Sequence, residues 1–129
     1  MREAWEASEE QRDWKAHVRS DLTTYLDVLA SEPAFAWALH IEVLAAGTRA
    51  LERRAEIFAL FTQRTRRIHE LAGERDPSLP GLPREVFMLH TGGMDELIRE
   101  HLRTHGAKTL PSIAGPAVAA TLAMLGARS

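Results

Sequence analysis

The stretch WKAHVRSDLTTYLDVL, residues 14–29, carries the apolar spacing that decides the fold. Its large apolar side chains recur at steps of three and four residues, at Trp14, Val18, Leu22, Tyr25, Leu26 and Leu29. This spacing places them on one face of an α-helix. Ser8 with Gln11 three residues later fits a capping box, so we expect a helix over about residues 9–30.

The helical spacing continues beyond this stretch. Pro33 suits a first helical turn, and residues 34–46 are apolar nearly all round, which predicts a second helix enclosed by others. Gly47 suits a turn, and Thr48 can cap a third helix that ends at Gly73. The inward stripe of this third helix is predicted to hold Leu51, Ala55, Phe58, Thr62, Thr65, His69 and Ala72.

The second half of the chain follows the same pattern. Residues 73–83 form a loop rich in proline and glycine, and a fourth helix is predicted from about Pro83 to His105, with Gly106 as its stop. Its inward residues are predicted to be Val86, Phe87, His90, Met94, Leu97, Ile98 and His101. In the last segment, residues 110–125, Pro111 opens a short turn, Pro116 starts or kinks a helix, and Gly126 ends it.

Strand signals are nearly absent, since valine and isoleucine are sparse and no Asn-Gly or Asp-Gly turn occurs. We therefore expect one all-α domain over residues 1–129, a bundle of five to six helices.

Composition excludes several classes of protein. The chain has 45% hydrophobic residues and no cysteine, which excludes disordered proteins, disulfide scaffolds, thiolate nucleophiles and iron–sulfur clusters. A formal charge of −2 argues against binding nucleic acid by bulk electrostatics. There is no apolar run of a secretory signal or of a membrane span, so we expect a cytoplasmic protein without a membrane partner.

Catalytic and metal motifs are also missing. None of the six histidines follows a glutamate by three residues, as a di-iron bundle requires, and no nucleophile-elbow or phosphate-loop pattern occurs. His101 and His105 share a helix face and are compatible with two metal ligands, but they equally suit a cationic helix C-terminus. Six arginines between residues 49 and 67 alternate with glutamates, which favours a solvated face over a nucleic-acid patch. We expect no enzyme, metal or cofactor.

Polar residues on otherwise apolar helix faces indicate a small-molecule pocket, because such pockets combine aromatic walls with a few convergent polar groups. The alternative is a core in which each histidine or threonine has a local hydrogen-bond partner. The predicted pocket residues are Trp37, His40, Ile41, Leu44, Phe58, Phe61, Thr62, Thr65, Phe87, His90, Thr91 and Met94.

Gly92 and Gly93 interrupt the fourth helix, at a cost of roughly 2 kcal/mol relative to alanines. Close approach of another helix would offset this cost. We expect an isologous homodimer interface, with an intrachain contact to the last helix as the alternative. Its predicted residues are Leu89, Gly92, Gly93, Glu96, Val118, Leu122 and Leu125.

Taken as a set, several motifs resemble the C-terminal ligand-binding and dimerisation domain of TetR-type transcriptional regulators. They are LTTYLDVL at residues 22–29, EPAFA at 32–36, EVLAAG at 42–47, Leu79-Pro80, TGGMDELI at 91–98, and the Gly106–Pro116 joint. The resemblance covers about residues 15–127. It implies a pocket for a small apolar effector among the four long helices and a four-helix dimer interface formed by the last two.

These 129 residues lack the helix-turn-helix unit that precedes this domain in such regulators. Contact with DNA is therefore expected only through a missing N-terminal domain, whether the chain is a piece of a longer regulator or a standalone relative. The alternative is a standalone helical protein–protein interaction module, in which Trp5, Trp14, Trp37 and the last helix are recognition surface or plain core. An enzyme ranks third.

Overall fold

In the computed structural model, residues 2–127 are described, with side chains from Trp14 onwards. Within this part the chain is all helical and contains no strand, which confirms the predicted all-α bundle. The elements are α1 (Arg2–Ser31), α2 (Pro33–His40), the 3-10 turn η1 (Glu42–Ala45), α3 (Thr48–Arg75), α4 (Arg84–His105), the 3-10 turn η2 (Leu110–Ile113) and α5 (Ala114–Met124).

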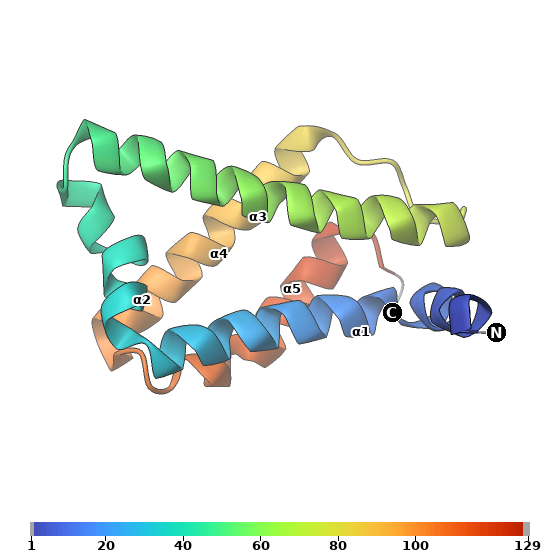
Figure 1. Ribbon diagram of the computed structural model, residues 1–129, viewed down its shortest axis with the longest axis horizontal. Helices are drawn as coiled ribbons and strands as arrows, with labels where there is room; N and C mark the ends of the chain where they lie inside the picture. The colour runs from blue at the N-terminus through green and yellow to red at the C-terminus, as the bar shows by residue number, and fades with distance from the viewer. Residues whose placement is uncertain (1, 128–129) are drawn as a thin grey trace.

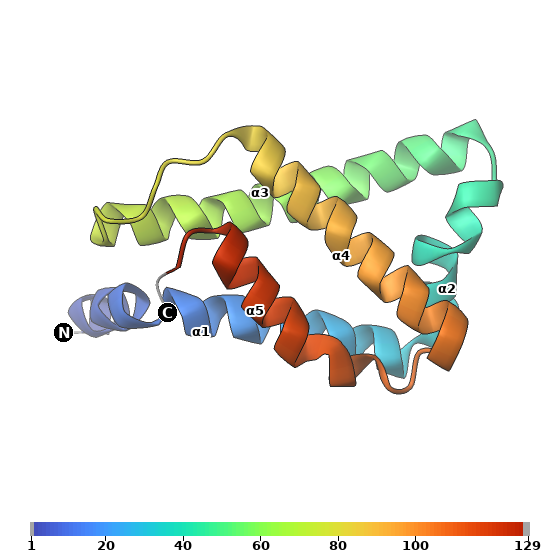
Figure 2. The same cartoon turned by 180° about the vertical axis from the view of Figure 1, so that it is seen from behind.

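The long helices α1 and α3 lie on one side of the molecule and are bridged at one end by α2 and η1 (Figure 1). Helix α4 runs diagonally behind them, and Figure 2 shows α4 and α5 together on the opposite side. Helix α5 packs against both α1 and α4. Helix α4 therefore crosses both α1 and α3 at an angle (Figure 1).

Two apolar clusters hold this arrangement together. One lies toward the α2 end of the molecule and contains Leu26, Leu29, Ala36, Ile98, Leu102, Ala107 and Leu110. The other lies toward the opposite end and contains Trp14, Val18, Ile68, Ala72, Phe87 and Leu125. Along α1 and α4 the two clusters are separated by a stretch of mixed polar and apolar residues. This stretch lines the candidate site.

Helix α1 begins earlier than predicted. The backbone is helical from Arg2, so the helix does not start at residue 9. The side chains of Ser8 and Gln11, the predicted capping box, lie outside the described residues, as does that of Trp5.

The predicted second helix over 34–46 is wrong in length and in burial. It ends at His40, because Ile41 leaves helical geometry with φ −124° and ψ −62°. The carbonyl of His40 instead accepts a 2.9 Å hydrogen bond from Nε of Arg99 on α4. Phe35 and Leu44 are 47% and 45% exposed, so this segment covers one end of the bundle and is not enclosed.

Helix α3 differs from prediction at both ends. Gly47, with φ 99°, is the cap residue in place of Thr48, and the helix continues through Gly73 to Arg75. It stops there because Asp76 precedes a proline and adopts an extended conformation. Leu51 and Ala55, predicted inward, are exposed, since α2 and η1 hold this end of α3 away from α1 (Figure 1).

The remaining predictions for the second half are confirmed with small changes. Helix α4 runs from Arg84 to His105 and ends at Gly106, whose φ of 82° suits glycine. Pro111 lies in η2, and Pro116 lies in the first turn of α5. Leu97, predicted inward on α4, is 38% exposed. No helix in the described part of the chain has both the length and the apolar character to cross a bilayer.

Candidate functional site

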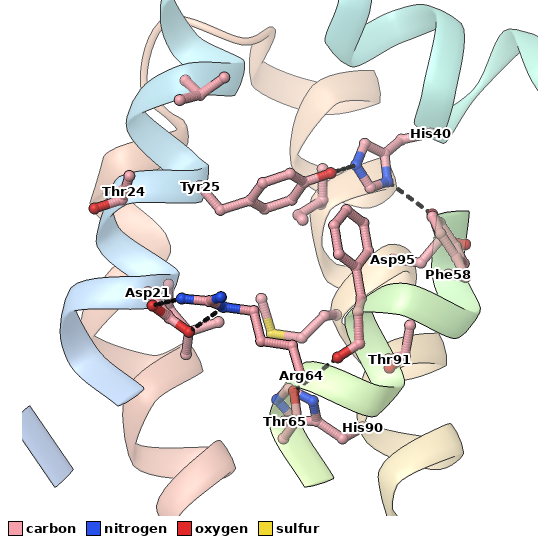
Figure 3. Close-up of a pocket in the computed structure, with 15 residues that line it drawn as sticks. Asp21, Thr24, Tyr25, His40, Phe58, Arg64, Thr65, His90, Thr91 and Asp95 are labelled. Carbon is pink, nitrogen blue, oxygen red and sulfur yellow. Dashed lines mark hydrogen bonds and ion pairs between the residues drawn. The ribbon is translucent and has the colours of Figure 1, made fainter. Parts of the chain in front are cut away.

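A cavity of about 330 Å³ opens between α1, α3 and α4, in the stretch that separates the two apolar clusters (Figure 3). This volume lies at the lower end of the range for small-molecule sites. The cavity is lined by Asp21, Leu22, Thr24, Tyr25, Val28, His40, Phe58, Phe61, Arg64, Thr65, His90, Thr91, Met94, Asp95 and Ile98.

Aromatic rings form much of the wall. The rings of Tyr25 and Phe61 meet edge to face with centroids 5.2 Å apart, and Phe58 lies 5.8 Å from Phe61. The His40 ring lies 6.0 Å from Phe58. Rings packed at these distances leave an apolar interior that suits an apolar ligand.

A hydrogen-bonded chain of three side chains closes the α2 end of the cavity. The Tyr25 hydroxyl lies 2.7 Å from Nε2 of His40, and Nδ1 of His40 lies 2.8 Å from Oδ1 of Asp95 (Figure 3). His40 and Asp95 are both buried. An ionised carboxylate can only accept, so Nδ1 of His40 donates to Asp95.

Asp95 is ionised because its partners outweigh its burial. Burial acts to raise the pKa of the Asp95 carboxyl, but hydrogen bonds from His40 and Arg54 and the charges of Arg99 and Arg54 lower the pKa below its ordinary value. Arg54 lies 2.6 Å from Oδ2 of Asp95, and Arg99 also bonds this oxygen. The Arg54 guanidinium stacks over the Phe58 ring at 4.3 Å, so the wall and the ionic cluster are joined.

Burial also keeps Tyr25 a neutral phenol. Desolvation, with the nearby charge of Asp95, raises the pKa of Tyr25 far above its ordinary value. The group therefore acts at neutral pH as a hydroxyl donor and acceptor, never as a phenolate.

A second polar group lies toward the α5 end. Nε2 of His90 lies 2.8 Å from the hydroxyl oxygen of Thr121 on α5, and that hydroxyl lies 2.8 Å from the carbonyl of Ala117. Nδ1 of His90 is buried and has no hydrogen-bond partner. Burial lowers the pKa of His90, so its ring is neutral.

The mouth of the cavity lies between α1 and α3 and carries one ion pair. Nε and Nη2 of Arg64 donate to the two carboxylate oxygens of Asp21 at 2.7 and 2.8 Å (Figure 3). Thr24 and Val28 are exposed beside it. The Arg64 side chain is 63% exposed, so the pair is a solvated bridge worth little stability.

The cavity gathers part of the predicted pocket. His40, Phe58, Phe61, Thr65, His90, Thr91 and Met94 line it. Five predicted residues do not. Trp37 and Ile41 pack against the cluster near α2, and Phe87 is buried in the opposite cluster. Leu44 is 45% exposed, and the Thr62 hydroxyl lies 2.7 Å from that of Thr91.

The predicted dimer residues divide between the surface and the interior. Leu89 is 68% exposed, and Gly92, Gly93 and Glu96 lie beside it on the outer face of α4. Val118 and Leu125, by contrast, are buried within the chain, and Leu122 packs against the cluster around Phe87. The prediction is therefore wrong for Val118 and Leu125, because an apolar helix with little amphipathic contrast does not reveal its inner side.

The glycine pair has no partner helix within the described part of the chain. A Cβ added at Gly92 or Gly93 meets nothing within 4 Å. The intrachain contact between α4 and α5 does exist, through His90 and Thr121 among others, but it does not lie at this glycine pair.

The arginines of α3 and the histidine pair at the end of α4 make local contacts outside the cavity. Arg53, Arg66 and Arg67 pair with glutamates on the exposed face of α3. His101 and His105 stack at 5.0 Å, and Nε2 of His101 lies 2.9 Å from the Thr109 hydroxyl. No group of three metal-ligating side chains occurs among the described residues.

The sequence interpretation missed Tyr25, Asp95 and Arg99 as site residues. Tyr25 lies on the apolar face of α1 and was counted as core. Asp95 falls on the inner stripe of α4, one residue after Met94, and a carboxylate on such a stripe is a signal that could have been used. Arg99 follows Asp95 by one helical turn, the spacing of an ion pair.

Comparison with models of known protein families, with curated proteins and with solved structures gives no match.

Proposed function

We propose that this chain is an effector-sensing and dimerisation domain of the kind found in TetR-type transcriptional regulators, and not an enzyme. The observation that carries the proposal is the cavity between α1, α3 and α4, which joins aromatic walls to a small number of polar groups. Its effector is a small, largely apolar molecule. The proposal includes a homodimer, and contact with DNA only through a separate N-terminal domain.

The position of the cavity supports a sensing role. It separates the two apolar clusters, so a guest contacts α1, α3 and α4 at once. A ligand changes the spacing of these helices only if it binds one arrangement more tightly than the other. In a regulator, such a change would alter the distance between two DNA-reading units and weaken their fit to paired half-sites.

The outer face of α4 supports the homodimer. Met88, Leu89 and Leu97 are exposed apolar side chains around the open glycine notch. Helix α5 lies on the same side of the molecule and exposes the small side chains Ala119 and Ala120 (Figure 2). Small side chains allow two helices to approach closely. The same face of a second copy of the chain can therefore pack against this one.

Two measurements test the proposal on the 129-residue chain. Light scattering is expected to give twice the 14.4 kDa chain mass, and a chain that stays monomeric at high concentration refutes the dimer. Thermal unfolding is expected to shift upward with 4-propylphenol, since 100-fold excess of free ligand over Kd adds about 2.7 kcal/mol to the stability. The same chain is expected to show no sequence-specific DNA binding.

Matched variants locate both effects. Thr65→Trp places a large ring in the cavity and should abolish the thermal shift, while Gln63→Trp, on the exposed face of the same helix, should retain it. Leu89→Lys should produce monomers, while Leu60→Lys, at a leucine that is 64% exposed on α3, should leave the dimer intact. Equal behaviour within either pair contradicts the assigned surface.

The rival is a helical interaction module that binds another protein. The apolar face of α4 and α5 would suit it as well, but such a module has no use for the cavity. A monomeric chain whose unfolding temperature is unmoved by apolar compounds favours the rival.

A further inference from the structure

The hydrogen bonds of His90 determine which of its ring nitrogens carries the proton. The Thr121 hydroxyl has one proton, and the carbonyl of Ala117 lies 2.8 Å from it. If Thr121 donates to that carbonyl, Nε2 of His90 must be the N–H that donates to Thr121, and both observed bonds are made. The opposite tautomer loses one bond and strands a buried N–H at Nδ1. Nδ1 of His90 is therefore a buried acceptor without a partner, on a residue that lines the cavity.

The Tyr25 hydroxyl proton is also already used. Nδ1 of His40 donates to Asp95, and the charges of Asp95 and Glu96 are balanced by Arg54 and Arg99. A protonated His40 would add an uncompensated positive charge to this buried group. In the tautomer that donates from Nδ1 to Asp95, Nε2 of His40 accepts the proton of Tyr25, and the phenol oxygen presents only lone pairs to the cavity.

The hydroxyls of Thr62, Thr65 and Thr91 leave no donor either. The Thr65 hydroxyl donates to the carbonyl of Phe61. The hydroxyls of Thr62 and Thr91 lie within hydrogen-bond distance of each other and of the carbonyls of Phe58 and Phe87. Their two protons are used in these bonds. At the exposed mouth, two N–H groups of Arg64 donate to Asp21, while its other N–H groups and the Thr24 hydroxyl remain available as donors. Away from Arg64 and Thr24 at the mouth, the polar atoms that line the cavity thus accept hydrogen bonds but have no proton to offer.

We propose that the effector is a neutral apolar molecule carrying a hydroxyl or N–H group, which donates a hydrogen bond to Nδ1 of His90. This inference rests on the proposed function and names the chemical class of its ligand. A carboxylate beside His90 is disfavoured, because it would be desolvated there without a donor to compensate its charge. Ethers and ketones of the same shape bind more weakly, since they leave the His90 nitrogen unsatisfied.

Three probes of matched shape test the inference: 4-propylphenol, 4-propylanisole and 4-propylbenzoate. Calorimetry should give the phenol about tenfold tighter binding than the anisole, corresponding to one net hydrogen bond. The benzoate should bind on the order of a hundredfold more weakly than the phenol, because of its desolvation. Equal affinity of phenol and anisole, or tighter binding of the benzoate, overturns the donor requirement while the cavity stands. If none of the three binds, the proposed function itself fails.

A substitution of His90 and the ¹⁵N NMR spectrum of its ring test whether Nδ1 of His90 is the acceptor. His90→Phe should reduce the phenol to the affinity of the anisole, whereas His105→Phe, exposed at the end of α4, should retain the preference. If His90→Phe does not fold, the ¹⁵N resonances of the unaltered chain decide. Free protein should show His90 protonated at Nε2 alone, and the phenol but not the anisole should shift the Nδ1 resonance. A proton on Nδ1 in the free protein refutes the assignment.

Discussion

Asp95→Asn tests whether the ionic cluster on α4 holds the bundle together. The carboxylate accepts hydrogen bonds from His40, Arg54 and Arg99 on three different elements. An asparagine keeps the shape but turns an NH₂ group toward one of these donors and removes the negative charge. The amide keeps one oxygen, so either the imidazole N–H of His40 or the guanidinium groups of Arg54 and Arg99 lose their acceptor.

The expected loss follows from burial. Removing one partner of a buried ion pair costs about 3–5 kcal/mol. The Arg54 and Arg99 side chains keep 24% and 19% exposure, so water partly replaces the lost contacts and the lower end of the range applies. A loss of about 3 kcal/mol is a large share of a typical stability of 5–15 kcal/mol. In a chain of this length it lowers Tm by roughly 10 °C.

Urea unfolding at pH 7, followed by circular dichroism, measures this loss. Glu96→Gln is the matched control, because the Glu96 carboxylate also bonds Arg99 but is 68% exposed. This substitution should change the free energy of unfolding by less than about 1 kcal/mol. If Asp95→Asn costs no more than Glu96→Gln, the cluster is not a stabilising centre and the charge balance used to assign His40 is unsound.

Three further predictions concern the core, the backbone and pH. Phe87→Ala, at a ring that is 1% exposed, should lower the free energy of unfolding by about 3–5 kcal/mol in urea titration. Gly126→Ala should destabilise the fold, since φ is 85° and the new Cβ would lie 2.7 Å from the Pro80 ring. Gly73→Ala lies within helix α3 with free space around it and should stabilise the fold by about 0.5–1 kcal/mol. Thermal melts of the two variants should therefore shift in opposite directions. The pKa of His90 is lower in the folded chain than in the unfolded one, so the unfolded state binds more protons and stability should fall as pH drops below about 6.5. His90→Gln should remove that part of the slope in unfolding curves taken between pH 7 and pH 5, and an unchanged slope would show that His90 is not its source.

Helix type and position were accessible from the sequence, because apolar spacing, proline and glycine act locally. Gly106, Pro111 and Pro116 mark their boundaries as expected. The failures come from contacts between distant segments. Nothing near His40 in the sequence announces that Arg99 binds its carbonyl and that α2 stops there.

The candidate site divides in the same way. Phe58, Phe61 and His90 were found because polar and aromatic residues stand out on a helix face, and the structure lines the cavity with them. Tyr25 and Asp95 were missed because each acts through a partner far away in the sequence. For α5 the sequence gives no inner side, so the burial of Val118 and Leu125 required the packed structure.

The cluster around Phe87 joins opposite ends of the chain, since it contains both Trp14 and Leu125. The faces of α1 and α4 that pack against α5 therefore stay uncovered until α5 is in place. A nascent chain that stops short of α5 exposes those faces to other molecules and is prone to aggregate. Packing at this end of the bundle is therefore complete only when Leu125 of the α5 end meets Trp14 of α1.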